Sequence, residues 1–307
     1  MGSGMILCAD IGGSFIDFAV VRRDGDIGHR HAEPTPLHDL EAFVGTLEQL
    51  CAPWPDLPLH IAIAGVEDPV TGIVRAANIP CLQKGPLVAL LRQRTGRNVL
   101  IGNDADCFAL AESRFGIAQG YRNVFGVILG TGVGGGYVVD GRVVPGLGGV
   151  TGEWGHGPFV VPPPGAPADV RKFTPSFPCG CGQVGCLDTI AGARALERLH
   201  VWAGGRVADS QAIVTAWGQG EPDAVHTMEI YLSYLSSALA LVVNVTGSMI
   251  LPVGGGLGSS SALVAAIDRS VRERILVRED RPLVVQAVLG KNAGLLGAAC
   301  LSADTKR

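Results

Sequence analysis

The segment that decides the fold is MILCADIGGSFIDFAVVR, residues 5–22. An apolar run ends at Asp10, a Gly-Gly-Ser turn follows, and a second apolar run begins at Phe15. Two apolar runs around a glycine turn predict two antiparallel strands. A similar unit returns at 124–144, where an apolar run, a glycine-rich turn and a hairpin signal at Asp140-Gly141 follow one another. This internal repeat predicts an α/β protein with two similar halves around a cleft.

Helices and strands alternate along the rest of the chain. Apolar spacing predicts helices over 39–51, 87–95, 104–115, 191–202, 210–218, 223–245, 261–274 and 292–301. Short apolar runs predict strands at 59–64, 99–101, 249–253 and 283–288. The most apolar stretch, 238–253, is interrupted by polar residues, glycine and proline, so it predicts a helix end, a turn and a strand rather than a membrane span.

Composition limits the class of protein. The chain has 307 residues, of which 47% are hydrophobic and 17% charged, which is enough for two domains with an ample core. A net charge of -4 gives no bulk attraction for nucleic acid. The apolar run from Met5 ends at Asp10, so we expect no signal peptide, no membrane association and a cytoplasmic location. Residues 1–4 are interpreted as an expression scar.

A cysteine motif at mid-chain predicts a metal site. The run CGCGQVGC, residues 179–186, follows the tetrapeptide EWGH of residues 153–156. Three thiols on one glycine-rich turn and one imidazole supply the four ligands of a closed tetrahedral zinc site. The predicted ligands are His156, Cys179, Cys181 and Cys186. A disulfide is the weaker alternative, because a third thiol would stay unpaired, and His156 could also be an ordinary surface or core residue.

Three glycine turns follow apolar runs and predict contacts with phosphate. Their candidate residues are Asp10, Gly12, Gly13 and Ser14, then Gly130, Thr131 and Gly132, then Gly254, Gly255 and Gly256. Backbone N–H groups in such turns can approach phosphate oxygens, and Asp10 can hold hydrated Mg²⁺. One such turn alone is more often a plain hairpin turn. Three together indicate a nucleotide lying across a cleft.

Two common nucleotide-binding motifs are missing. The sequence GxxxxGK[ST] does not occur, which excludes a P-loop NTPase. The dinucleotide fingerprint also fails, because a hairpin signal rather than a helix follows Gly132.

Asp104 is the candidate catalytic base. It stands where a predicted strand meets a predicted helix, a position that projects a carboxylate into a cleft. Such a carboxylate can accept the proton of an attacking hydroxyl group in phosphoryl transfer. From the residues alone, a helix N-cap is an equally supported interpretation. Asp106 is the second candidate and is otherwise a surface or packing residue, while Glu112 is interpreted as part of a solvated helix face.

Together these motifs resemble the ROK family of sugar kinases and repressors, within the hexokinase–actin ATPase superfamily. The resemblance begins at Met5 and includes the turns at 10–14 and 130–136, Asn103-Asp104, the EWGH tetrapeptide and the cysteine motif. It implies two ribonuclease-H-like α/β domains around a cleft. The small domain would cover 5–103, joined by a C-terminal helix at 290–305, and the large domain would cover 104–289.

The resemblance also implies which residues bind the sugar. They are Asn78, Asn103, Asp104, Glu153, His156 and Asp188. Asn78 has a second interpretation as a turn residue before proline. The family usually has Thr where Ser14 stands, Glu where Asp188 stands, and often Ser where Gly192 stands. Zinc would be a scaffold for the sugar site, with one ring nitrogen of His156 on the metal and the other toward a sugar hydroxyl.

The activity that the resemblance implies is ATP-dependent phosphorylation of the 6-hydroxyl of N-acetylglucosamine, with Mg²⁺ as the catalytic metal and a structural Zn²⁺. The choice of sugar rests on the long connection between His156 and Cys179, which is similar to that of bacterial N-acetylglucosamine kinases. Its three phenylalanines, Phe159, Phe173 and Phe177, could form an apolar wall for the acetyl group.

Other functions remain as alternatives. Within the same family, the chain could be a glucokinase or an N-acetylmannosamine kinase. A non-catalytic sugar sensor or repressor is the alternative of another class. A repressor would carry a DNA-binding module ahead of the first glycine turn, and we expect none here because Asp10 lies so near the start. Family members are commonly oligomers, so the resemblance implies a homo-oligomer, a dimer in the simplest case.

Overall fold

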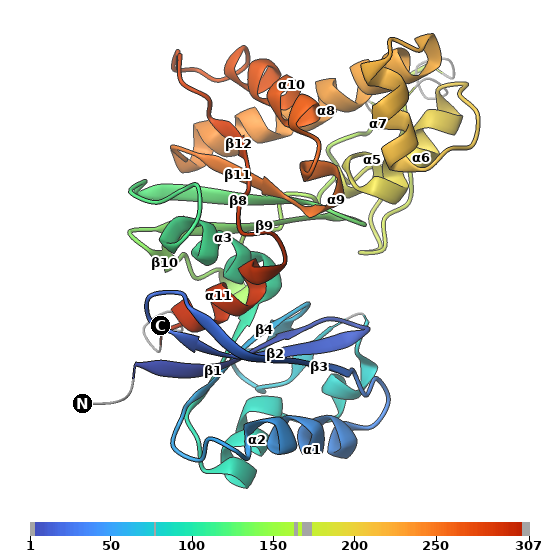
Figure 1. The fold of residues 1–307 in the computed structure, drawn as a ribbon. Helices are drawn as coiled ribbons and strands as arrows, with labels where there is room; N and C mark the ends of the chain where they lie inside the picture. The colour runs from blue at the N-terminus through green and yellow to red at the C-terminus, as the bar shows by residue number, and fades with distance from the viewer. Residues whose placement is uncertain (1–3, 77, 163–164, 168–173, 303–307) are drawn as a thin grey trace. The chain divides into compact units, whose positions relative to one another are not determined.

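The computed structural model describes residues 4–76, 78–162, 165–167 and 174–302 (Figure 1). These residues form two compact units. As far as its residues are described, unit 1 comprises Met1–Gly120, Gly136–Thr151 and Val288–Arg307, and unit 2 comprises Tyr121–Gly135 and Gly152–Ala287. Both units contain helices and strands, so the predicted α/β class is confirmed.

Unit 1 is built on a five-stranded mixed sheet. Its order is β3-β2-β1-β4-β7, with β1 (Met5–Ile11), β2 (Phe15–Arg22), β3 (Ile27–Pro34), β4 (Leu59–Ile63) and β7 (Val99–Asn103). The first three strands are antiparallel, whereas β4 and β7 extend the sheet in parallel from β1. The predicted hairpin over 5–22 is confirmed, because Ile11 pairs with Ile16 across the turn.

Helices cover both faces of this sheet. On one side lie α1 (Leu40–Cys51) and α2 (Leu87–Thr95), and their apolar residues join the core of buried strand residues. On the other side, α11 (Ala293–Cys300) packs against β1, β2 and β4, and α3 (Asp104–Arg114) packs against α11 (Figure 1). Shorter elements complete the unit: β5 (Val66–Glu67), β6 (Val74–Arg75), and the 3-10 helices η1 (Pro80–Lys84), η2 (Leu147–Gly149) and η3 (Gly290–Asn292).

The second sheet repeats the topology of the first. Its order is β10-β9-β8-β11-β12, with β8 (Asn123–Leu129), β9 (Val133–Val139), β10 (Arg142–Val143), β11 (Leu251–Gly254) and β12 (Val284–Gln286). When the strands of each sheet are numbered from 1 to 5 in chain order, both sheets have the spatial order 3-2-1-4-5. The predicted internal repeat is therefore confirmed.

Most helices of unit 2 pack against one long helix, α8 (Pro222–Thr246). The other helices described in this unit are α5 (Asp188–Ala191), α6 (Ala193–Trp202), α7 (Ser210–Gly218), α9 (Gly255–Gly258) and α10 (Ser261–Arg272). Among the described residues, α8 is the one helix long and apolar enough to pass a simple test for a membrane span. It packs against α5, α6, α7 and α10, which is the environment of a core helix.

Some sequence expectations need correction. The predicted helix over 191–202 begins at Ala193 as α6, because Gly192 has extended backbone, and the short helix α5 before it was not predicted. The predicted turn at Gly254–Gly256 is a strand end followed by the short helix α9. Strand β3 was not predicted. The domain boundary after residue 103 stays a prediction; α3, which begins at Asp104, belongs to unit 1.

Candidate active site and metal-binding turn

Asp10 is a half-buried carboxylate near the end of β1. It pairs across the hairpin with Asp17 of β2, and Arg30 of β3 donates to both oxygens of Asp17, from Nε at 3.0 Å and Nη2 at 2.5 Å. Burial, and then the negative charges of Asp104 and Asp17, raise the pKa of Asp10 to about 6, against the opposing charge of Arg30. A divalent cation bound at Asp10 would offset the negative charges of these carboxylates and would favour the ionised form of Asp10.

Helix α11 closes one side of Asp10. A β-carbon placed on Gly294, in the first turn of that helix, would collide with the Asp10 carboxylate. The close approach therefore requires glycine at this position. Sequence analysis missed Gly294, Asp17 and Arg30. The hairpin register could have revealed Asp17, because a turn at 12–14 places it opposite Asp10.

The first glycine turn is held by Thr35, a buried residue that sequence analysis also missed. Thr35 Oγ1 donates to the Gly12 carbonyl at 2.8 Å, and Thr35 N donates to the Ser14 carbonyl at 3.0 Å. Asn78 lies beside the turn, since a β-carbon on Gly13 would be 3.1 Å from Asn78 Cβ. The predicted phosphate turn and the predicted sugar ligand Asn78 are thus neighbours in unit 1.

Two neighbouring side chains, Asn103 and Asp104, accept hydrogen bonds from backbone N–H groups at the start of α3. Asn103 is the N-cap: its Oδ1 accepts from the backbone N–H groups of Ala105 (2.9 Å) and Asp106 (3.4 Å), and its Nδ2 donates to the Gly65 carbonyl at 3.2 Å. Asp104 is the first helical residue, and its Oδ1 also accepts from Ala105 N at 2.9 Å. Asn103 therefore fills the N-cap position, and Asp104 adds a second acceptor for the N–H group of Ala105.

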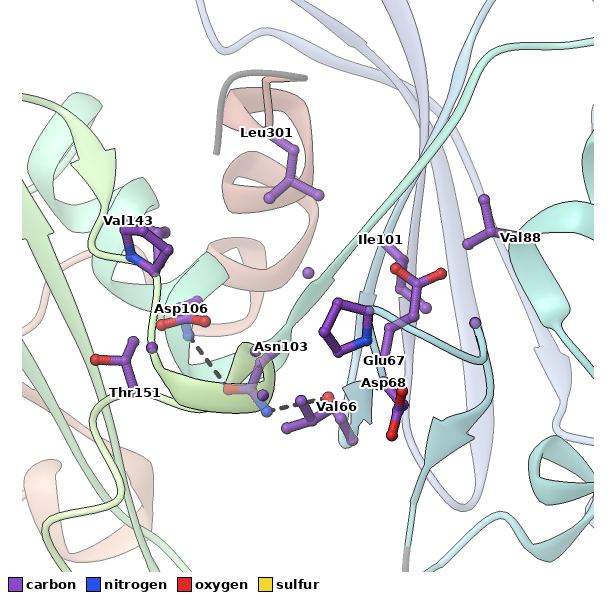
Figure 2. Close-up of a pocket in the computed structure, with 18 of the residues that line it drawn as sticks. Val66, Glu67, Asp68, Val88, Ile101, Asn103, Asp106, Val143, Thr151 and Leu301 are labelled. Atoms are coloured by element: carbon purple, nitrogen blue, oxygen red, sulfur yellow. Dashed lines mark hydrogen bonds between the residues drawn. The ribbon is translucent and has the colours of Figure 1, made fainter. Parts of the chain in front are cut away.

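A cavity of about 450 Å³ borders this helix start within unit 1 (Figure 2). It is lined by the loop at 65–69, the end of β7 with Asn103, Asp106 of α3, the segment at 143–151, and Leu301. Cavities of this size accept small molecules. Asn103 is the predicted sugar ligand that lines it, and Asp106, the second candidate base, is buried beside it.

The four predicted metal ligands come together in unit 2. One ligand atom from each of His156, Cys179, Cys181 and Cys186 lies within 4.8 Å of all the others. His156 Nδ1 is 3.6 Å from Cys179 Sγ, and Cys181 Sγ is 3.6 Å from Cys186 Sγ. Zn–S bonds near 2.3 Å in a tetrahedron put ligand atoms about 3.8 Å apart, so this donor set fits zinc. All three cysteines are free thiols, which contradicts the disulfide alternative.

Backbone hydrogen bonds shape the cysteine turn. Cys179 N donates to the Gln183 carbonyl at 2.8 Å, and Gly182 N donates to the Cys179 carbonyl at 3.0 Å. A hydrogen bond from the Gln183 backbone lowers the pKa of Cys181 to about 7, whereas burial raises the pKa of Cys179 to about 11. A bound cation would favour the thiolate form of each cysteine.

His156 is placed between the cysteines and Glu153. Its Nδ1 faces Cys179, and its Nε2 lies 3.6 Å from the Glu153 carboxylate. A carboxylate beside the second ring nitrogen is the usual way in which proteins orient a metal-binding imidazole. The prediction that this nitrogen faces a sugar hydroxyl stays a prediction.

The second glycine turn is attached to segments around the metal ligands. Val133 N donates to Asp188 Oδ1 at 2.8 Å, and Ala193 N donates to the Gly130 carbonyl at 2.8 Å. Trp154 Nε1 donates to the Gly134 carbonyl at 3.0 Å. The turn that contains the candidate ATP contacts Gly130, Thr131 and Gly132 is therefore fixed from several directions within unit 2.

Glu112 was interpreted as a solvated residue, and this was wrong. Its exposed fraction is 0%, and its carboxylate accepts from the backbone N–H groups of Ile117, Val288 and Leu289, each at 3.0 Å. The last two residues lead into η3 and α11. Glu112 therefore fastens the end of α3 to the segment that brings α11 back to unit 1.

Two of the three aromatic residues proposed as a wall for the acetyl group lie among the described residues. Phe159 is 39% exposed, and the Phe177 ring lies 4.5 Å from the guanidinium carbon of Arg198. Phe173 lies outside the described residues. The apolar wall stays a prediction.

Two five-stranded sheets of the same order, a half-buried aspartate near the end of the first strand and a Cys₃His cluster define a two-unit α/β protein of the sugar-kinase type. The chain belongs to the ROK family, which it matches over residues 6–305. It is 34% identical over 301 residues to the N-acetylgalactosamine kinase AgaK of Shewanella sp. (strain ANA-3), a match that covers 95% of this chain and 94% of that protein.

Two further comparisons agree. The chain is 31% identical over 301 residues to the N-acetyl-D-glucosamine kinase of Pasteurella multocida (strain Pm70), with 95% of this chain and 97% of that protein covered. The crystal structure of a ROK family glucokinase from Streptomyces griseus, in complex with glucose and AMPPNP, superposes with a TM-score of 0.73 at 30% identity, covering 98% of this chain and 100% of that one. The predicted family and hexokinase-like fold are confirmed.

Proposed function

We propose that this protein is an ATP-dependent sugar kinase that phosphorylates the 6-hydroxyl of N-acetylglucosamine. The observation that carries the proposal is the pair of carboxylates in unit 1: Asp104 follows the helix cap, and its charge adds to the effect of burial in raising the pKa of Asp10. The first two relatives described above are named as kinases of N-acetylated hexosamines, which supports this class of acceptor. We further propose a cytoplasmic homodimer.

In the proposed reaction, Asp104 accepts the proton of the sugar hydroxyl as its oxygen attacks the γ-phosphorus of ATP. The bond from this phosphorus to the bridging oxygen breaks, and ADP leaves. Mg²⁺, when bound, neutralises charge on the phosphates. Asp10 would hold the cation, and the backbone of the glycine turns would contact the phosphates.

Of the residues that the resemblance implies, Asn78, Asn103, Asp104, Glu153 and His156 would hold the acceptor. Asp188 is left out of this set, because its carboxylate accepts from Val133 N in the second glycine turn. Hydrogen bonds of this kind fix which hydroxyl group reaches the base, because a 1 Å error in placement is costly for transfer.

A panel of acceptors tests the function. ADP release would be measured with N-acetylglucosamine, N-acetylgalactosamine, N-acetylmannosamine and glucose at pH 8, where an Asp10 with a pKa of about 6 is ionised. We expect kcat/KM for N-acetylglucosamine to exceed that for glucose roughly tenfold or more, since a site built for the amide leaves polar groups unpaired with glucose. A larger value for glucose would identify a glucokinase, and no turnover with any sugar would favour the sensor alternative.

We also propose that His156, Cys179, Cys181 and Cys186 hold one structural Zn²⁺. Purified protein should contain about one zinc per chain by elemental analysis. Cys181→Ser should lower that content, because it removes one of the thiolate ligands. The fold should tolerate the change, since Cys181 is exposed and the new hydroxyl is not buried. Cys300 lies outside the cluster, so Cys300→Ser is the matched control, and this variant should bind as much zinc as the wild-type protein. Active wild-type protein without zinc would refute this assignment.

A further inference from the structure

Asp188 joins two features of unit 2 that the sequence keeps far apart. Its Oδ1 accepts the backbone N–H of Val133 at 2.8 Å, in the second glycine turn, and its Oδ2 lies 4.0 Å from Cys179 Sγ. Its own backbone N–H donates to the Gly155 carbonyl at 2.9 Å, next to His156. One residue therefore contacts the glycine turn and both segments that carry the metal ligands.

The fit of this side chain against the turn is close. A β-carbon placed on Gly132 would lie only 2.6 Å from Asp188 Oδ1, so the carboxylate occupies the space that a larger residue at 132 would need. The family usually has Glu at position 188, and its carboxylate lies one methylene further from the backbone than that of Asp188. A Glu at this position could not keep both its carboxylate and the turn where they are now without a shift of one of them.

We propose that Asp188 is a positioning residue of the nucleotide-binding turn, and that through it the metal-binding turn fixes the backbone on which the ATP phosphates would rest. This inference rests on the proposed function for its kinetic consequence, but its structural part does not. In this chain the carboxylate serves the glycine turn, whereas the resemblance alone assigns it to the sugar.

The structural part is tested by amide hydrogen exchange. In Asp188→Ala the N–H of Val133 loses its acceptor, so peptides covering 130–136 should exchange roughly tenfold faster, without any substrate present. Asp209→Ala is the matched control, because it removes a carboxylate that accepts from Ala212 N at 2.8 Å elsewhere in unit 2. Unchanged exchange in the Asp188→Ala variant would overturn the positioning role, whatever the enzyme's activity.

The kinetic part is tested by affinity for Mg-ATP, measured calorimetrically without sugar. Asp188→Ala should weaken nucleotide binding about tenfold, whereas Asp188→Asn, which keeps an oxygen acceptor for Val133, should bind nearly as wild type does. KM for the sugar should change far less than nucleotide affinity in the Ala variant. The reverse pattern, a large rise in sugar KM with unchanged nucleotide affinity, would return Asp188 to the sugar site and refute the inference while leaving the kinase function intact.

Discussion

Asp104→Asn is expected to lower kcat by roughly a hundredfold or more, because the amide cannot accept the proton of the acceptor hydroxyl. The fold should survive the change. Asn103 caps α3, so the helix keeps its N-cap, and loss of one negative charge at a helix N-terminus costs about 1 kcal/mol at most. Steady-state kinetics with saturating ATP and sugar would measure the effect, together with sugar affinity to show that binding persists.

Asp106→Asn is the control for this experiment. Asp106 lies two positions along the same helix, is buried and lines the cavity in unit 1. If Asp104 is the base, the Asp106 variant should keep most of its kcat even where its stability changes. A near-normal kcat for the Asp104 variant, with a collapse for the Asp106 variant, would reassign the base.

Glu112→Ala is expected to destabilise the protein by about 3 kcal/mol or more. The substitution leaves three backbone N–H groups without their acceptor, and each buried donor left in this way costs about 1–3 kcal/mol. In a protein of this size the midpoint of thermal unfolding should fall by about 6 °C or more. Differential scanning calorimetry of the two proteins would measure the shift.

Two further variants serve as comparisons for Glu112→Ala. Glu112→Gln keeps one oxygen acceptor but turns an amide group toward another donor, so its loss should be intermediate. Glu41→Ala removes an exposed glutamate that pairs with Arg94 at 2.5 Å, and it should change the midpoint little. Equal midpoints for Glu112→Ala and wild type would show that water or a neighbour replaces the carboxylate.

The parts of the fold that could be predicted are those in which the spacing of apolar residues within one segment shows which residues are buried. The hairpin over 5–22, helix α2 and helix α7 emerge with their predicted bounds, because their apolar spacing and glycine or aspartate ends are local signals. Strand β3 has little such signal: it is an edge strand whose residues are mostly exposed. Arg30, which pairs with Asp17 beside Asp10, was missed for the same reason.

The candidate site shows a similar division. The clustering of the candidate metal ligands was predictable, because three cysteines close together on one glycine-rich turn are typical of a zinc site. The role of Glu112 could not be predicted, because two of its three donors, Val288 and Leu289, are 176 and 177 positions away from it along the chain. The contact between Asp188 and Val133 spans 55 positions and depends on one methylene of side-chain length, which no local pattern records.

Helix α11 has a consequence for how the chain is made. It covers one face of the first sheet, and Gly294 closes the side of Asp10, yet residues 293–300 are synthesised long after residues 5–63. While synthesis continues, β1, β2 and β4 are complete but their apolar residues on that face have no permanent cover. These strands are therefore made long before the helix that covers them, and in that interval their uncovered apolar surface favours aggregation of the nascent chain and binding of chaperones.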